Sequence, residues 1–153
     1  MGKLFLVATP IGNLADITFR AVECLKEADI IACEDTRHSR ILLDHYGIDT
    51  RTTSYHEHNK YEKAEELVAE MQKGKNVAVI TDAGTPGISD PGEELVKQSI
   101  AAGIEVTSLP GPSAVITALS MSGISSRRFV FEGFLSADKK ERKAAFDRLQ
   151  NET

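Results

Sequence analysis

Short apolar segments alternate with amphipathic helical segments along most of this chain, and the connections between them are short. The apolar segments, which we expect to be strands, are residues 3–9, 29–33, 51–55, 76–80 and 105–109. Apolar residues recur at helical spacing in residues 17–28, 39–46, 60–73, 93–102 and 113–120. Strict alternation of this kind predicts an α/β fold, with a mainly parallel sheet and helices on both of its faces. The third strand is the weakest of the five, so we expect it at an edge.

The pattern changes near residues 122–128, SGISSRR, where Gly, Ser and Arg replace apolar residues. Beyond this point the sequence predicts one strand, residues 129–132, and one helix, residues 139–150. A segment of about 25 residues is too short to be a domain. We therefore expect an N-terminal α/β domain over residues 1–122. Residues 123–153 should be a linker and the first strand and helix of a second α/β domain that this chain does not complete.

The charge of the chain limits its partners. Its 153 residues carry a net charge of −5 at pH 7, so it has no general attraction to nucleic acid. RNA contact would need a local basic patch, and residues 127–143 supply one, with six Lys or Arg against three Asp or Glu. Cys24 and Cys33 form no C-x-x-C pair, the N-terminus lacks the features of a secretory signal, and no segment is apolar enough to span a membrane. These features favour a cytoplasmic protein with no membrane partner.

The most unusual connection is TDAGTPGISDPG, residues 81–92, which joins the fourth strand to the next helix. It holds three glycines, two prolines and two aspartates. Glycines let a ligand approach the backbone closely, and parallel sheets bind ligands at the carboxyl ends of their strands. The loop is therefore predicted to bind a ligand. The alternative is an elaborate turn, although an ordinary strand-to-helix connection needs only a few residues.

Two further loops leave the carboxyl ends of strands in the same way. TPIGNLADIT follows the first strand. LPGPS follows the fifth and places Ser113 at a helix N-terminus, where its hydroxyl and the free N–H groups can meet a polar ligand. The dinucleotide fingerprint G-x-G-x-x-G and the phosphate loop G-x-x-x-x-G-K-[ST] are both absent. We expect the three loops to outline one pocket built largely from backbone, although each loop taken alone is compatible with a simple turn.

Charged and imidazole side chains follow the second and third strands. In CEDTRHSR, Asp35 suits either a helix cap or a substrate contact, and Arg37 suits an anion or phosphate. In YHEHN, His56 and His58 would share a face if the strand continues. An H-x-H pair with no third ligand in register is weak evidence for a metal, so we predict no metal site. A general base, an RNA contact and a structural role all stay open for these histidines.

Six motifs, in their order and spacing, resemble the tetrapyrrole (corrin/porphyrin) methylase family, and within it the group of ribosomal RNA small-subunit methyltransferases I. They are VATPIGNLADIT, CEDTRHSRILL, HEHN, TDAGTPGISDPG, LPGPSAVITALSMSG and FEGFL, and they cover essentially the whole chain. The resemblance implies a homodimer of two-domain chains with S-adenosylmethionine in the cleft between the domains, of which residues 1–122 form half. It also implies methylation of a ribose 2′-hydroxyl of a cytidine in the 16S ribosomal RNA of the small ribosomal subunit.

The resemblance assigns the cofactor to the three loops. The implied cofactor contacts are Pro10, Ile11, Asp82, Ala83, Gly84, Thr85, Ile88, Ser113 and Ala114. Thr85 stands where the wider family has Asp, which leaves open what its side chain does. A ribose hydroxyl is a poor nucleophile, so a base would help. We expect Asp35, Arg37 and His56 to be the catalytic residues on the substrate side, with His58 and Asp82 as further candidates for the base.

Two other classes of function stay open. A methylase of a tetrapyrrole or another small acceptor would need an enclosed, apolar acceptor pocket, whereas the Arg- and His-rich loops favour a charged acceptor. The chain could also be a non-catalytic ligand-binding or interaction module. The apolar helix over residues 113–120 suits either the core or a dimer interface, and we favour the core.

Overall fold

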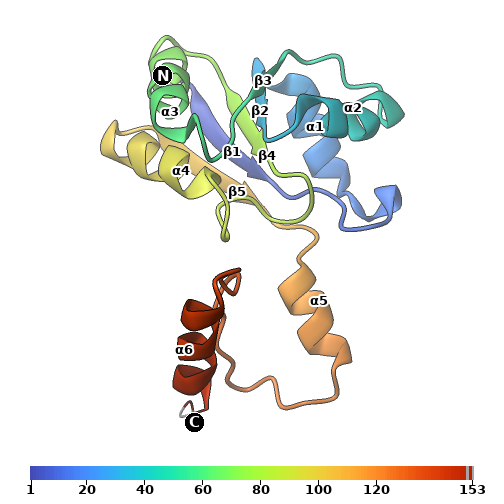
Figure 1. Cartoon of the computed structure of the whole chain (residues 1–153). Coiled ribbons are helices and arrows are strands. Elements are labelled where there is room, and N and C mark those ends of the chain that lie inside the picture. The colour runs from blue at the N-terminus through green and yellow to red at the C-terminus, as the bar shows by residue number, and fades with distance from the viewer. Residues whose placement is uncertain (151, 153) are drawn as a thin grey trace. The chain divides into compact units, whose positions relative to one another are not determined.

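The computed structural model describes residues 1–150 and residue 152. The chain forms two compact units, Met1–Gly123 and Ile124–Thr153. In the described residues, the first unit holds a five-stranded parallel sheet in the order β3-β2-β4-β1-β5 (Figure 1). The strands are β1 (Lys3–Val7), β2 (Ile30–Cys33), β3 (Thr52–Ser54), β4 (Val77–Ile80) and β5 (Glu105–Leu109). The expected α/β fold and the edge position of the third strand are confirmed.

Two of the five α-helices of the first unit begin at a residue whose side chain caps them. The five are α1 (Phe19–Glu27), α2 (Thr36–His45), α3 (Lys60–Gln72), α4 (Gly92–Ala101) and α5 (Ala114–Met121), with a 3₁₀ turn at Leu14–Asp16. The Thr18 hydroxyl accepts a hydrogen bond from the Ala21 amide at 3.1 Å and so caps α1. Asp35 caps α2, which therefore starts three residues earlier than the apolar pattern of residues 39–46 predicts.

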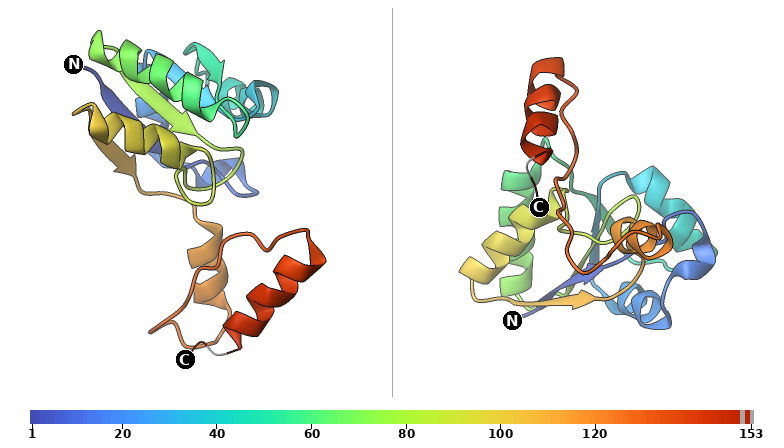
Figure 2. Two further views of the ribbon diagram at one scale, coloured as in Figure 1. Left: turned by 60° about the vertical axis from the view of Figure 1, so that its left-hand side comes forward. Right: turned by 90° about the horizontal axis from the view of Figure 1, so that it is seen from below.

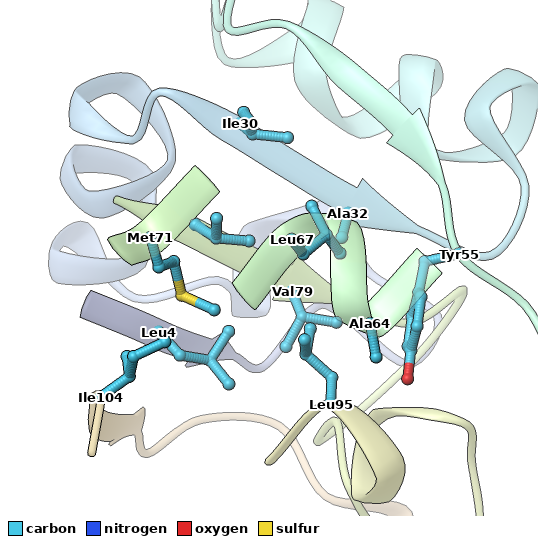
Figure 3. Close-up of a cluster of buried hydrophobic side chains, with 11 residues drawn as sticks. Leu4, Ile30, Ala32, Tyr55, Ala64, Leu67, Met71, Val79, Leu95 and Ile104 are labelled. Atoms are coloured by element: carbon cyan, nitrogen blue, oxygen red, sulfur yellow. The ribbon is translucent and has the colours of Figure 1, made fainter. Parts of the chain in front are cut away.

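The helices cover the sheet in two layers. Figure 2 shows α3 and α4 on one side of the sheet, and α1 and α2 on the other. One core cluster joins the sheet to α3 and α4 through Leu67 and Leu95, and it is drawn in Figure 3. A second cluster joins the sheet to α1 and α2 through Leu25 and Leu43. Because both faces are covered, β2 and β4 are apolar at every position, IIAC and VAVI, and are wholly buried.

The register of the sheet brings the strand ends together at one edge. Val7 pairs with Leu109, and Cys33 pairs with both Ile80 and Ser54. The loops that follow β1, β2, β3, β4 and β5 therefore all start at this edge, which we call the carboxyl edge. This is the arrangement that strand-to-helix alternation predicts for a parallel sheet.

Helix α5 differs from the expectation that it packs in the core. Its sequence, AVITALSM, is largely apolar, yet none of its described residues is buried. Ile116 and Met121 are both exposed. The helix leaves β5 after Pro112 and extends away from the layered part of its unit, so the core that α1 to α4 cover does not reach it (Figure 1). The apolar residues of α5 are therefore an exposed surface rather than part of the core.

The second unit contains one helix in its described part, α6 (Lys139–Leu149). Asp138 caps it, accepting hydrogen bonds from the Lys140 and Glu141 amides at 2.9 and 3.0 Å. The strand expected over residues 129–132 does not form. A strand needs a neighbour that completes its ladder, and the described residues from 124 onward contain no other strand. No helix in the described part of the chain is long and apolar enough to cross a membrane.

Candidate functional site

The loops after β1 and β4 are joined by backbone hydrogen bonds. The Thr9 amide donates to the Gly84 carbonyl, and the Gly84 amide donates to the Thr9 carbonyl, both at 3.0 Å. The buried Thr9 hydroxyl adds a hydrogen bond to the Thr81 carbonyl at 3.2 Å. These two of the three predicted loops therefore behave as one structural element.

The third loop is tied to the same element. The Thr85 hydroxyl donates a hydrogen bond to the Pro112 carbonyl at 3.0 Å. The role of this side chain, which the sequence left open, is therefore to link the loop after β4 to the loop after β5. A Cβ on Gly111 would lie 2.9 Å from the Ala8 side chain, so only glycine lets the loop after β5 approach the end of β1 so closely. The three loops form one surface at the carboxyl edge.

Gly84 lies where the three loops meet. Its φ of +90° favours glycine over every residue with a side chain. A Cβ built on it would lie 3.6 Å from the Ile11 side chain and 4.0 Å from the Pro112 carbonyl oxygen. A larger side chain at this position would therefore project into the junction between the loops.

The rest of the loop over residues 81–92 is held by Asp90. Its carboxylate accepts hydrogen bonds from the Ile88 amide at 3.1 Å and the Gly92 amide at 2.6 Å. Ser89, between them, has a φ of +57°, which is strained for a residue with a side chain. The Tyr55 hydroxyl donates to the Pro91 carbonyl at 2.6 Å inside the core, and so anchors the end of the loop to the end of β3. Strain held by such contacts is typical of binding loops.

The predicted cofactor residues divide into two groups. Four of them, Pro10, Ile11, Asp82 and Ala83, line a cavity of about 320 Å³ that also borders α2. The other five lie outside this cavity: Gly84, which is buried, and Thr85, Ile88, Ser113 and Ala114, which are half-buried or exposed. Ser113 stands at the N-terminus of α5, and its hydroxyl makes no capping hydrogen bond. It therefore remains available to a ligand.

Asp35 and Arg37 interact with each other on the first turn of α2. The Asp35 carboxylate accepts hydrogen bonds from the Arg37 and His38 amides at 2.8 and 3.4 Å. The Arg37 guanidinium lies 3.3 Å from the same carboxylate, and its side chain is 91% exposed. These contacts lower the pKa of Asp35, first of all the hydrogen bond from the Arg37 side chain. A carboxylate stabilised in its charged form is a weak base, so the structure favours the helix-cap role that the sequence left open.

Glu34, one residue earlier, was not among the predicted site residues. Burial raises the pKa of Glu34, and the nearby carboxylates of Asp82 and Asp90 raise it further. Glu34 directly follows β2, and Asp82 follows the adjacent β4 after a single residue. The sequence shows that an acidic residue follows each of these two strands. Only the order of the strands in the sheet shows that the two residues lie near each other.

His56 lies two residues after β3, which neighbours β2 on the side opposite β4. Its amide donates to the Asn59 side chain at 2.8 Å, and its ring lies 5.9 Å from the ring of His58. In the part of the chain that the structure describes, His56 Nδ1 is buried without a hydrogen-bond partner. Over residues 1–150 and 152, no three His, Cys, Asp or Glu side chains are arranged to hold a metal ion.

Comparisons with known proteins agree with these motifs. The family model described as Tetrapyrrole (Corrin/Porphyrin) Methylases matches residues 3–153. The chain is 54% identical over 151 residues to "Ribosomal RNA small subunit methyltransferase I" of Escherichia coli, covering 99% of this chain and 53% of that protein. It is 57% identical over 150 residues to the protein of the same name from Haemophilus influenzae, covering 98% and 52%.

A solved structure with a similar fold is the uroporphyrin-III-C-methyltransferase from Thermus thermophilus. It aligns with a TM-score of 0.62 and 23% identity over 81% of this chain and 54% of that one, which shows the fold alone. The chain spans about half the length of the curated relatives it matches. The family match extends over almost every residue, including all three loops. The chain therefore belongs to the tetrapyrrole methylase family.

Proposed function

We propose that this chain is part of an S-adenosylmethionine-dependent methyltransferase that acts on small-subunit ribosomal RNA. The observation that carries the proposal is the junction of three strand-end loops around Gly84, in a chain whose family is methylases. The names of relatives more than 50% identical to it support ribosomal RNA as the substrate. At a finer level, we propose the 2′-hydroxyl of a cytidine in 16S ribosomal RNA as the acceptor.

The residues at the junction suit S-adenosylmethionine. Gly84 has no side chain to block the junction of the loops, where it is buried, and the Ser113 hydroxyl at the N-terminus of α5 makes no capping hydrogen bond. Such a surface can hold the polar methionine part of the cofactor through backbone groups. The exposed carboxylate of Asp82 adds negative charge next to Gly84, which favours a cationic cofactor. The cofactor would supply an activated methyl group on a positive sulfur.

The chain's own contribution to the reaction is positioning. The loops must hold the acceptor oxygen in line with the methyl group and keep water away. On the acceptor side we propose Arg37 as a phosphate contact, because its guanidinium is exposed at the carboxyl edge. Asp35 would act through Arg37, which it holds in place, and His56 is the proposed proton acceptor. The basic residues of 127–143 would add contacts to the RNA backbone.

We also propose the division of the chain and its assembly. Residues 1–122 would form half of the cofactor cleft, and residues 123–153 would begin the domain that forms the other half. The exposed apolar residues of α5 support pairing with another chain or domain, and a homodimer is the form we propose. A cytoplasmic location would follow from the ribosomal RNA substrate.

Methyl transfer tests the function. The chain, joined to the part of the Escherichia coli relative that it does not match, is incubated with labelled S-adenosylmethionine and one of three acceptors: small ribosomal subunits, their free RNA or uroporphyrinogen. We expect label in the RNA, and digestion to nucleosides should place it on a ribose. Label in uroporphyrinogen alone would show a small-acceptor methylase. Absence of label from every acceptor, in a protein that binds the cofactor, would contradict the proposal.

A further inference from the structure

The cavity of about 320 Å³ at the carboxyl edge is not explained by the loops alone. Its walls are residues 9–14 after β1, residues 80–83 at the end of β4, and one face of α2. It lies wholly within the first unit of the chain. Its volume is at the lower end of the range for small-molecule sites. It is therefore large enough for one ring system and too small for an extended cofactor.

Most of the cavity wall is aliphatic. The side chains involved include Ile11, Leu14, Ile41, Leu42 and Ile80. Ile41 is 62% exposed, which is high for a large apolar residue on a helix that has a buried face available. Aliphatic walls of this kind suit an apolar ligand surface such as the face of a planar ring.

One wall carries a buried hydroxyl that has no hydrogen bond. Ser39 on α2 lines the cavity and is only 4% exposed. Among the described residues, its Oγ has no hydrogen-bond partner by geometry. Its polar neighbour is the Cys33 thiol, whose pKa burial raises and the Ser39 hydroxyl partly lowers, and a thiol is a weak hydrogen-bond partner. A buried polar atom left this way destabilises a protein, so a ligand that hydrogen-bonds to it would remove that cost.

The charges around the cavity indicate which part of a ligand it holds. The described residues that line it include no Lys or Arg, so it is unsuited to a phosphate group. Its polar groups are short and neutral, apart from His38 and the carboxylate of Asp82. The exposed guanidinium of Arg37 precedes His38 on α2. A neutral ring inside, with a phosphate near Arg37, matches one nucleotide of an RNA strand.

We propose that this cavity is a nucleobase subsite, in which Ser39 hydrogen-bonds the base of the acceptor nucleotide between Ile41 and Ile11. The proposal rests on the proposed function. The cofactor also contains a base, adenine, so two sources share this chemistry. The acceptor is favoured because five of the nine proposed cofactor residues, Gly84, Thr85, Ile88, Ser113 and Ala114, lie outside the cavity. The other four, Pro10, Ile11, Asp82 and Ala83, line it, so the proposed cofactor site and the base subsite would share a wall.

The test maps ligands on the ¹⁵N-labelled chain by amide chemical shifts. The probes are CMP, UMP, AMP and GMP, each at up to about 10 mM, since single nucleotides bind weakly, and S-adenosylmethionine. We expect at least one nucleotide to shift the amides of Leu14, Ser39 and Ile41. Ile41→Trp should weaken that binding about tenfold or more by filling the cavity from an exposed position. Ile100→Trp is the matched control, because Ile100 is 63% exposed on α4.

Ser39→Ala distinguishes a role of the hydroxyl in nucleotide binding from a role in the stability of the chain. It should weaken nucleotide binding about fivefold, the value of one hydrogen bond, without lowering the melting temperature of the free chain. Three results would overturn the inference: no nucleotide shifts these amides, both variants bind as the unmodified chain does, or S-adenosylmethionine competes for the same amides. If the protein binds a nucleotide in the cavity but fails the methyl-transfer test, the proposed reaction is wrong and the subsite still stands.

Discussion

Replacing Gly84 by Arg should abolish S-adenosylmethionine binding while leaving the chain folded. The new side chain would begin between Ile11 and the Pro112 carbonyl, at 3.6 and 4.0 Å, and would occupy the junction of the three loops. It would also bring a positive charge to a site that must accept a positive sulfur. We expect affinity to fall by about 100-fold or more, which corresponds to about 2.7 kcal/mol. At saturating cofactor, the unmodified protein should gain about 5–10 °C in melting temperature, and the variant should gain almost none.

Gly103→Arg is the control for this substitution. Gly103 also has a positive φ, +71°, so the backbone strain is comparable, but a Cβ there meets open space after α4. The control should lose stability through strain and keep its response to the cofactor. Equal responses to the cofactor in the two variants would show that the junction around Gly84 is not the binding site.

Removing the Tyr55 side chain should have the largest effect on stability. The ring is buried among residues of α3 and α4 (Figure 3), and the hydroxyl satisfies the Pro91 carbonyl. Burial raises the pKa of Tyr55, which keeps the hydroxyl protonated as a donor at neutral pH. Tyr55→Phe should cost about 0.5–1.5 kcal/mol, because one buried hydrogen bond is lost while the Pro91 carbonyl still accepts from the Glu94 amide at 3.1 Å. Tyr55→Ala should cost about 3–5 kcal/mol, because a cavity is also left.

Urea unfolding measures both Tyr55 variants, with Tyr61→Phe as the control. Tyr61 lies on α3 and is exposed, so loss of its hydroxyl should change stability by less than about 0.5 kcal/mol. If Tyr55→Phe were as stable as the unmodified chain, the hydrogen bond to Pro91 would not be what anchors the loop over residues 81–92.

The sequence was sufficient to predict the parallel sheet and the common edge from which the loops leave. Both follow from the alternation of strands and helices and from apolar runs such as VAVI. It was not sufficient for the order of the strands, which places β4 between β2 and β1. The closeness of the Glu34 and Asp82 carboxylates could therefore not be predicted, because it depends on β2 and β4 being neighbours.

Local patterns failed where distant contacts decide the outcome. The apolar sequence of α5 indicated burial, but burial needs a partner surface, and the described elements provide none for it. Residues 129–132 have strand composition and no strand to pair with. Ser39 looked like an ordinary residue near a helix start, and only its burial beside the cavity makes it a candidate ligand group. Tyr55 looked like the last residue of a weak edge strand, while its hydroxyl reaches Pro91.

The central claim, that the loops after β1, β4 and β5 form a cofactor site, is tested most directly by calorimetric titration of S-adenosylmethionine. The titration is made into this chain alone and into the chain joined to the unmatched part of the Escherichia coli relative. We predict saturable one-to-one binding by the joined protein, and weaker binding by the chain alone because it lacks half of the proposed cleft. If neither form binds S-adenosylmethionine while NAD or a free nucleotide binds with one-to-one stoichiometry, the claim is wrong and only the fold stands.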